Sequence, residues 1–124
     1  LSVPDIMPSL LAMMGLGSRI PQGVQGTDWS DALLGRGGDR PEFAPYYLIP
    51  PEAPHLGRRG LRTGRYTFVV TKRDDGKRTV VLYDNETDPH QLKDAAGTAP
   101  RVVADLTRKL NGWLKKTRDP FGKA

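Results

Sequence analysis

The side chains that could perform catalysis are few in this chain. Its 124 residues include no Cys and only two His, His55 and His90. The lack of Cys rules out a thiol nucleophile, a thiolate zinc site and a disulfide framework. Neither histidine stands in a pattern that would pair it with a serine and an acid for nucleophilic catalysis. We interpret His90, which follows Asp88-Pro89, as a turn residue.

Acidic residues alternate at Asp84, Glu86 and Asp88, as they do at the start of a calcium-binding loop. An EF-hand would continue with Gly at its sixth position and Glu six residues later, where Pro89 and Ala95 stand here. The pattern therefore excludes an EF-hand and indicates acids gathered in a turn. The glycines of residues 35–38 lead into no Lys-Ser/Thr pair, which excludes a phosphate-binding loop. We predict no catalytic and no metal-binding residue in this chain.

Positive charge dominates the second half of the chain. Residues 1–50 hold three basic and five acidic residues, whereas residues 51–124 hold 16 basic and nine acidic ones. Such a field attracts anions, although a solvated basic face explains it equally well. Nucleic acid is disfavoured as the partner, because no reading helix is recognisable and the aromatic residues lack the spacing of an RNA-binding sheet. The excess is densest at Arg58, Arg59, Arg62, Arg65, Lys72, Arg73, Lys77 and Arg78.

The first element that the sequence predicts is a helix over residues 4–15. Ser2 can cap it, and Asp5 lies where a carboxylate complements the helix dipole. Its apolar residues recur at helical spacing and predict a packed face, formed by Ile6, Leu10, Met13 and Met14. Residues 17–41 are rich in glycine and read as irregular, apart from a helical turn within residues 29–34.

The rest of the chain predicts a small sheet and a long helix. Strands are expected at residues 46–49, 61–63, 66–71 and 79–83, with a hairpin turn at Asp74-Asp75-Gly76 and a proline-rich loop that ends near Gly60. Residues 100–116 form an amphipathic helix, whose apolar stripe should pack on one face of the sheet. The predicted fold is α+β: an antiparallel sheet of three to four strands against a C-terminal helix, preceded by an N-terminal helix and a loop-rich segment.

Four stretches, in order along the chain, resemble signatures of the sulfatases. Residues 3–11 resemble the V-D-[IL]-x-P-T-L-L helix, and residues 23–29 the G-x-x-G-x-S-L stretch, with Asp28 and Trp29 as departures. Residues 59–66 resemble the R-[AG]-[VL]-R-T-x-x-Y strand, and residues 82–89 the L-Y-D-x-x-x-D-P signature. The resemblance identifies the chain as the C-terminal region of a sulfatase, in the arylsulfatase family of the alkaline-phosphatase-like superfamily.

This resemblance implies that the reactive centre lies outside the chain. Sulfatases use a formylglycine made within C/S-x-P-x-R, and residues 2–6 imitate that motif but place Ile6 where Arg is required. Formylglycine and calcium are therefore expected in a preceding catalytic domain, to which residues 1–42 would connect residues 43–124. The parent protein would hydrolyse sulfate esters, while this piece alone would be inactive. Export to the periplasm or beyond is expected for the parent rather than a cytoplasmic location.

The resemblance implies that this region closes one side of the substrate cleft, and the local density of positive charge makes residues 50–59 the loop where we expect substrate contacts. We expect His55, Arg58 and Arg59 to contact an anionic sulfate-ester substrate, with Arg62 and Arg65 as weaker candidates because arginines at strand ends often pair with acids. Tyr83 and Asp84 are expected to organise the turn before the last helix.

The partners expected for this region are the catalytic domain and the substrate, and no membrane. Without that domain, the apolar face of the first helix would be exposed, and we expect the isolated piece to form a dimer. The alternatives are a non-catalytic module that binds acidic polysaccharide or nucleic acid, and a phosphate or phosphonate ester hydrolase of the same fold.

Overall fold

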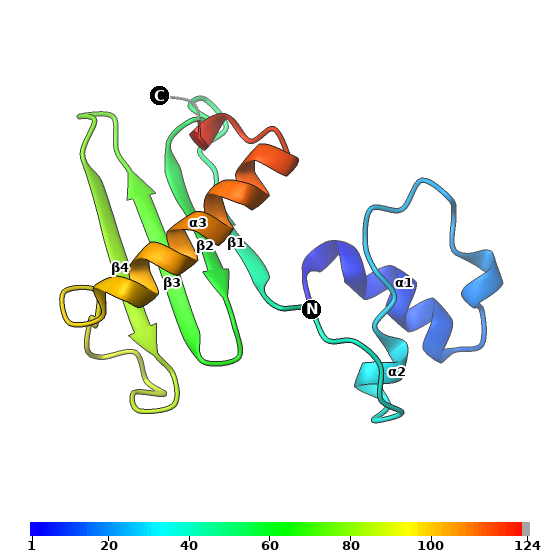
Figure 1. Ribbon diagram of the computed structural model, residues 1–124. Coiled ribbons are helices and arrows are strands. Elements are labelled where there is room, and N and C mark those ends of the chain that lie inside the picture. The colour runs from blue at the N-terminus through cyan, green and yellow to red at the C-terminus, as the bar shows by residue number, and fades with distance from the viewer. Residues whose placement is uncertain (123–124) are drawn as a thin grey trace. The chain divides into compact units, whose positions relative to one another are not determined.

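A computed structural model describes residues 1–122, and the chain divides after Ala44 into two units (Figure 1). The first unit holds helix α1 (Val3–Met13), a 3-10 turn (Gly17–Arg19) and the short helix α2 (Ser30–Leu33). The second unit holds a sheet and a helix, whose elements are β1 (Ala44–Leu48), β2 (Gly57–Arg62), β3 (Tyr66–Lys72), β4 (Arg78–Asp84), α3 (Pro100–Lys116) and the 3-10 turn η2 (Pro120–Gly122). No helix within residues 1–122 is both long and apolar enough to span a bilayer.

Helix α1 begins at a cap that the sequence predicts, and the cap also ties the helix to a distant loop. The Asp5 carboxylate accepts hydrogen bonds from the Ser2 hydroxyl at 2.6 Å, the Ser2 N–H at 2.8 Å and the Thr27 N–H at 2.9 Å. Burial alone would raise the pKa of Asp5, but these hydrogen bonds outweigh it and hold the pKa below its usual value. Asp5 therefore does more than complement the helix dipole.

The glycine-rich stretch passes directly across the first turns of α1. A Cβ on Gly26 would stand 1.9 Å from the Pro4 carbonyl oxygen, so only glycine permits this approach. The Ser9 hydroxyl accepts a hydrogen bond from the Trp29 N–H at 2.9 Å. The face of α1 that is buried in the chain is thus Asp5, Pro8 and Ser9, and not the apolar stripe.

The second unit confirms the predicted α+β fold, with four strands in the order β1-β2-β3-β4. β2 pairs with β3 and β3 with β4, both antiparallel, and the register places Leu61, Phe68 and Leu82 side by side. Helix α3, whose bounds match the predicted ones, crosses one face of the sheet (Figure 1). Between these two layers lies the core, formed by Leu61, Phe68, Val70, Leu82, Leu106, Leu110, Leu114 and Phe121.

Strand β2 begins earlier than predicted, at Gly57 and not at Leu61. The proline-rich loop therefore ends at Leu56 and not near Gly60, and both Arg58 and Arg59 belong to the strand, opposite Thr71 and Val70. The sequence conceals this start because two arginines do not show the apolar alternation of a strand. Gly57 makes the entry possible, with φ of +90° and its Cα so close to the Leu48 carbonyl oxygen that a Cβ would stand 2.1 Å away.

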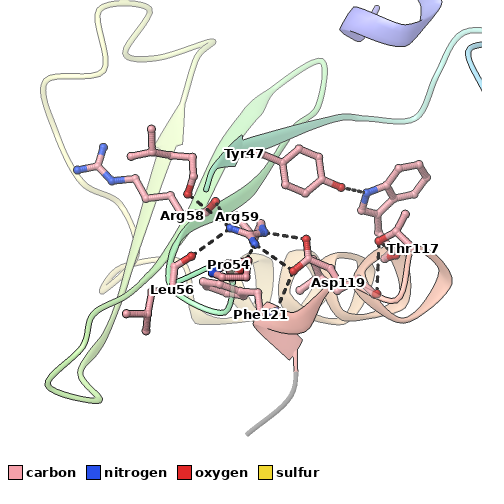
Figure 2. A network of polar contacts seen from close by, with 11 residues as sticks. Tyr47, Pro54, Leu56, Arg58, Arg59, Thr117, Asp119 and Phe121 are labelled. Atoms are coloured by element: carbon pink, nitrogen blue, oxygen red, sulfur yellow. Dashed lines mark hydrogen bonds and ion pairs between the residues drawn. The ribbon is translucent and has the colours of Figure 1, made fainter. Parts of the chain in front are cut away.

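Arg59 is completely buried, and Asp119 and Phe121 from the segment after α3 lie against it (Figure 2). Its Nε and Nη2 donate to the two carboxylate oxygens of Asp119 at 2.8 and 3.1 Å. The other donors reach the carbonyl oxygens of Pro54 at 2.8 Å, Arg58 at 3.1 Å and Leu56 at 3.3 Å. All five N–H groups of the guanidinium therefore have acceptors, as a buried cation requires.

Two aromatic rings enclose the same guanidinium. Its central carbon lies 4.9 Å from the centroid of the Phe121 ring and 5.6 Å from that of Tyr47. The Tyr47 hydroxyl in turn accepts a hydrogen bond from the indole N–H of Trp113 on α3. The Arg59 guanidinium thus connects four elements, which are β1, β2, α3 and η2.

Replacing Asp119 by Ala should destabilise the protein strongly, because it leaves the buried Arg59 charge without its counterion. The expected loss in the free energy of unfolding is about 3–5 kcal/mol. The matched control is Asp105→Ala, which removes an exposed carboxylate that pairs with Arg108 at 3.1 Å and Lys109 at 3.5 Å; it should cost less than about 1 kcal/mol. Urea unfolding followed by circular dichroism measures both, and equal losses would contradict this account of Arg59.

The Asp5 cap predicts a defined pH dependence of stability. Because the pKa of Asp5 is lowered in the folded state, its contribution is complete above the unfolded value of about 3.9 and is lost as the pH falls through the folded value. Asp5→Asn should therefore lower stability at pH 7 by about 1 kcal/mol. The difference in stability between Asp5→Asn and the wild type should disappear as the pH approaches 2.

Thermal unfolding at pH 7, 5, 3 and 2 measures this gap. Asp39→Asn, which changes an exposed acid in the same unit, serves as the control and should track the wild type. A gap for Asp5→Asn that stays constant down to pH 2 would refute the role assigned to the carboxylate charge.

Candidate functional site

The proline-rich loop before β2 consists of two successive turns. The Ala53 N–H donates to the Pro50 carbonyl at 3.2 Å, and the Leu56 N–H donates to the Ala53 carbonyl at 2.9 Å. Arg59 anchors this loop, because its guanidinium donates hydrogen bonds to the carbonyl oxygens of Pro54 and Leu56. His55, one of the predicted substrate contacts, is exposed on this anchored loop.

The three predicted site residues do not meet at one place. Neighbouring residues of a strand point to opposite faces, so Arg58 and Arg59 lie on opposite sides of the sheet. Arg58 is exposed on the face away from α3 and forms no ion pair within residues 1–122. Arg59 is buried on the helix side with every donor engaged, so it anchors the loop and has no donor to offer a ligand.

A shallow groove of about 390 Å³ lies on the face of the sheet that α3 does not cover. Two arginines from β2 line it at alternate positions, together with side chains from each of the other strands and from the loop after β4. The lining residues are Tyr46, Arg58, Arg62, Thr67, Val69, Tyr83 and Gln91.

Hydrogen bonds hold one side of this groove in place. The Thr67 hydroxyl accepts from the Arg62 guanidinium and from the Gln91 side-chain amide, the latter at 3.0 Å. The same amide donates to Asn85 Oδ1 at 2.8 Å. Gln91 has a φ of +54°, an uncommon backbone conformation for a residue with a side chain, and these bonds fix it there. Arg58 lines the same groove, and its guanidinium forms no ion pair within the described residues.

The side chains that line this groove match the chemistry of anion binding. Guanidinium groups match the planar pairs of oxygens on sulfate, phosphate and carboxylate, and tyrosines offer both a hydroxyl and a flat apolar face. The groove contains no nucleophile beside a base. Within the described part of the chain, no three His, Cys, Asp or Glu side chains gather as metal ligands would.

The acidic cluster after β4 has a structural role. Arg65 donates to both oxygens of Asp84, at 3.0 Å from Nε and 2.7 Å from Nη2, and also lies 3.3 Å from Glu86. The Arg65 hydrogen bond lowers the pKa of Asp84, and the carboxylate raises that of Arg65 in return. Asp88 accepts from the Lys93 N–H at 2.8 Å and closes the next turn. These contacts account for the acids without a metal ion.

Several residues of the groove escape the sequence reasoning. Tyr46, Tyr83 and Gln91 come from three different segments, and no motif links them. Once the strand register is known, alternation places Arg62, Thr67 and Tyr83 on the same face as Arg58. The start of β2 has no local signal in the sequence, so Arg58 and Arg59 have the character of loop residues until the strand is seen to begin at Gly57.

Comparison with known proteins finds matches along nearly the whole chain. No family model matches. An endo-4-O-sulfatase of Bacteroides thetaiotaomicron is 31% identical over 98% of this chain and 27% of its own length. A solved structure from Bacteroides fragilis, assigned as a sulfatase, is 38% identical and superposes with a TM-score of 0.81 over 96% of this chain and 26% of that one.

A further solved structure comes from a study of how Bacteroides thetaiotaomicron metabolises multiple glycosaminoglycans. It is 29% identical, with a TM-score of 0.77 over 98% of this chain and 28% of that one. The chain thus spans little more than a quarter of the length of the relatives that it matches. The four motifs and the fold agree with these matches: sulfatase homologues cover nearly the whole chain, which is consistent with a C-terminal sulfatase region.

Proposed function

We propose that this chain is the C-terminal part of an enzyme that hydrolyses sulfate esters, and that it forms one wall of the substrate cleft. The observation that supports the proposal is its 31% and 38% identity to sulfatases over nearly all its residues. Since the chain spans about a quarter of those proteins, the catalytic machinery belongs to the remainder. Alone, the chain would bind but not cleave.

The calcium ion and formylglycine implied by the family do not fit the residues described here. Residues 1–122 offer no cluster of metal ligands and no cysteine. The one serine in a similar motif, Ser2, donates its hydroxyl to Asp5 at the cap of α1, where Ile6 replaces the required arginine. Both groups are therefore assigned to the part of the protein outside this chain.

In this proposal, Arg58 and His55 contact the substrate. Both are exposed, and both are carried by a loop and strand that the buried Arg59 holds rigid. A rigid support matters because an arginine that is already positioned loses less entropy on binding an anion. Arg59 contributes to the site by holding this support in place.

The substrate class that we propose is a sulfated glycan that carries more than one negative charge. One relative is named as an endo-4-O-sulfatase, and another was studied for glycosaminoglycan metabolism. The basic groove agrees with such a substrate, since a second sulfate or carboxylate would be attracted to Arg58 and Arg62. The reacting sulfate itself would lie at the formylglycine.

Arg58→Ala in the complete enzyme should weaken activity on polyanionic substrates selectively. Loss of one charge-assisted hydrogen bond should lower kcat/KM for a sulfated oligosaccharide about tenfold. Activity on 4-nitrophenyl sulfate, which has no second anion, should stay within about twofold. His55→Ala should act in the same direction and more weakly, because an imidazole offers fewer hydrogen-bond donors to an anion than a guanidinium does.

Arg73→Ala serves as the matched control, since it removes an exposed arginine from the β3–β4 turn without touching the groove. Unchanged kcat/KM for all substrates with Arg58→Ala would refute the contact while leaving the sulfatase assignment intact. Absence of sulfatase activity in the complete wild-type protein would refute the assignment itself. Activity on phosphate or phosphonate esters, or binding of acidic polysaccharide without hydrolysis, would then identify the alternative.

We propose that the apolar face of α1 is covered by the catalytic domain of the complete protein. Within this chain Ile6, Leu10 and Met14 are 43%, 52% and 71% exposed, although they form the stripe that helical spacing predicts. An apolar face of this kind on a soluble protein marks an interface.

The isolated chain should therefore self-associate through α1. We expect a dimer at concentrations near 100 µM, on the order of a weak interface, and Leu10→Gln should shift it to monomer. Leu92→Gln, which changes a residue 85% exposed in the other unit, is the control and should leave the dimer intact. Sedimentation velocity distinguishes these states, and a wild-type monomer at the highest soluble concentration would contradict the proposal.

A further inference from the structure

A second and larger groove, of about 650 Å³, lies on the helix side of the sheet. α3 crosses the sheet obliquely, so the hairpin end of β3 and β4 lies beside the helix and not beneath it (Figure 1). Apolar side chains from three elements form the floor of the groove between hairpin and helix. They are Val70 and Val80 of the sheet, Leu110 and Leu114 of α3, and Phe121 of η2.

The rim of this groove is basic. Lys115 lies in the last turn of α3 and Arg118 just beyond it, both exposed and without an ion pair among residues 1–122, and Arg78 lines the groove from the start of β4. One carboxylate lines the groove, that of Asp119, and it is bound by Arg59 and by the Phe121 N–H at 2.8 Å. The charges of Lys115 and Arg118 are therefore not balanced by an acid of the groove.

The floor itself is apolar. Thr107 donates its hydroxyl to the Val103 carbonyl at 2.7 Å, so this donor is used within the helix. A polar group placed over the valine, leucine and phenylalanine side chains of the floor would lose its hydration. A hydrocarbon chain incurs no such cost and gains from contact with the valines and leucines.

We propose that this groove binds a small anionic amphiphile, with its hydrocarbon chain on the apolar floor and its carboxylate or sulfate head at Lys115 and Arg118. The volume lies in the range of about 300–1,000 Å³ that small-molecule sites occupy. The site is separate from the groove of Arg58, which lies on the opposite face of the sheet. It does not depend on the sulfatase assignment.

Titration of the 124-residue chain with decanoate, below its micellar concentration, tests the proposal. Methyl NMR spectra should show saturable shifts at Val70, Val80, Leu110 and Leu114. Decanol, which has the chain without the charge, and acetate, which has the charge without the chain, should each bind at least about tenfold more weakly. Decyl sulfate in place of decanoate tells whether the site prefers a sulfate or a carboxylate head, and binding of either supports the proposal.

The double variant Lys115→Gln/Arg118→Gln should weaken decanoate binding about tenfold while decanol binding stays unchanged. Arg101→Gln, which removes an exposed arginine from the first turn of the same helix, is the matched control. Thermal unfolding checks that each variant is folded, and the comparison of the four ligands on the wild type needs no variant. Shifts confined to the methyls of α1, or equal binding of decanoate and decanol, would overturn the proposal.

Discussion

The second unit depends on the burial of one charge. Arg59 has no contact with water, and Asp119 supplies its counterion from a position 60 residues later in the chain. A buried guanidinium is tolerated only when its charge is matched and its donors are all used. Satisfying these conditions brings β2, the proline-rich loop and the end of α3 to one point, and Tyr47 and Phe121 close it from two sides. The sulfatase-like R-G-L-R-T strand and the Asp-Pro after the last helix are thus two halves of one interaction.

That interaction also explains how a single strand serves two purposes. Because side chains alternate across a strand, fixing Arg59 inward necessarily directs Arg58 outward. The inward arginine holds the loop through its Pro54 and Leu56 carbonyls, and the outward one lies in a groove with Arg62. The sheet consequently has two distinct grooves, a smaller one on its open face that Arg58 and Arg62 line, and a larger one beside α3 that Lys115 and Arg118 line. The ligands that we propose for them are a polyanion in the first and an amphiphile in the second.

The sequence predicts best the elements whose signals are local. Helix α3 was delimited correctly because its apolar stripe, its proline start and its lysine end lie within 17 residues, and the hairpin at residues 74–76 followed from its Asp-Gly turn. The start of β2 was missed because its evidence lies far away: Arg59 reads as a loop cation until Asp119 is placed beside it. The groove of Arg58 was found only in part for the same reason, since Tyr46, Tyr83 and Gln91 converge through the strand register. In the first unit a local signal predicted the helix correctly but not the face that it buries. The apolar stripe of α1 is present, but the face buried within the chain is the one that carries Asp5 and Ser9.

Because Arg59 and Asp119 lie far apart in the sequence, the two partners of this ion pair are synthesised at different times. As the polypeptide leaves the ribosome, the sheet strands emerge well before the acid that neutralises the arginine at their centre. Desolvating that cation beforehand is unfavourable, so the packing of β2 against the helix side stays incomplete until Asp119 has emerged. A polypeptide truncated between α3 and Asp119 would therefore lack the counterion that the buried arginine needs.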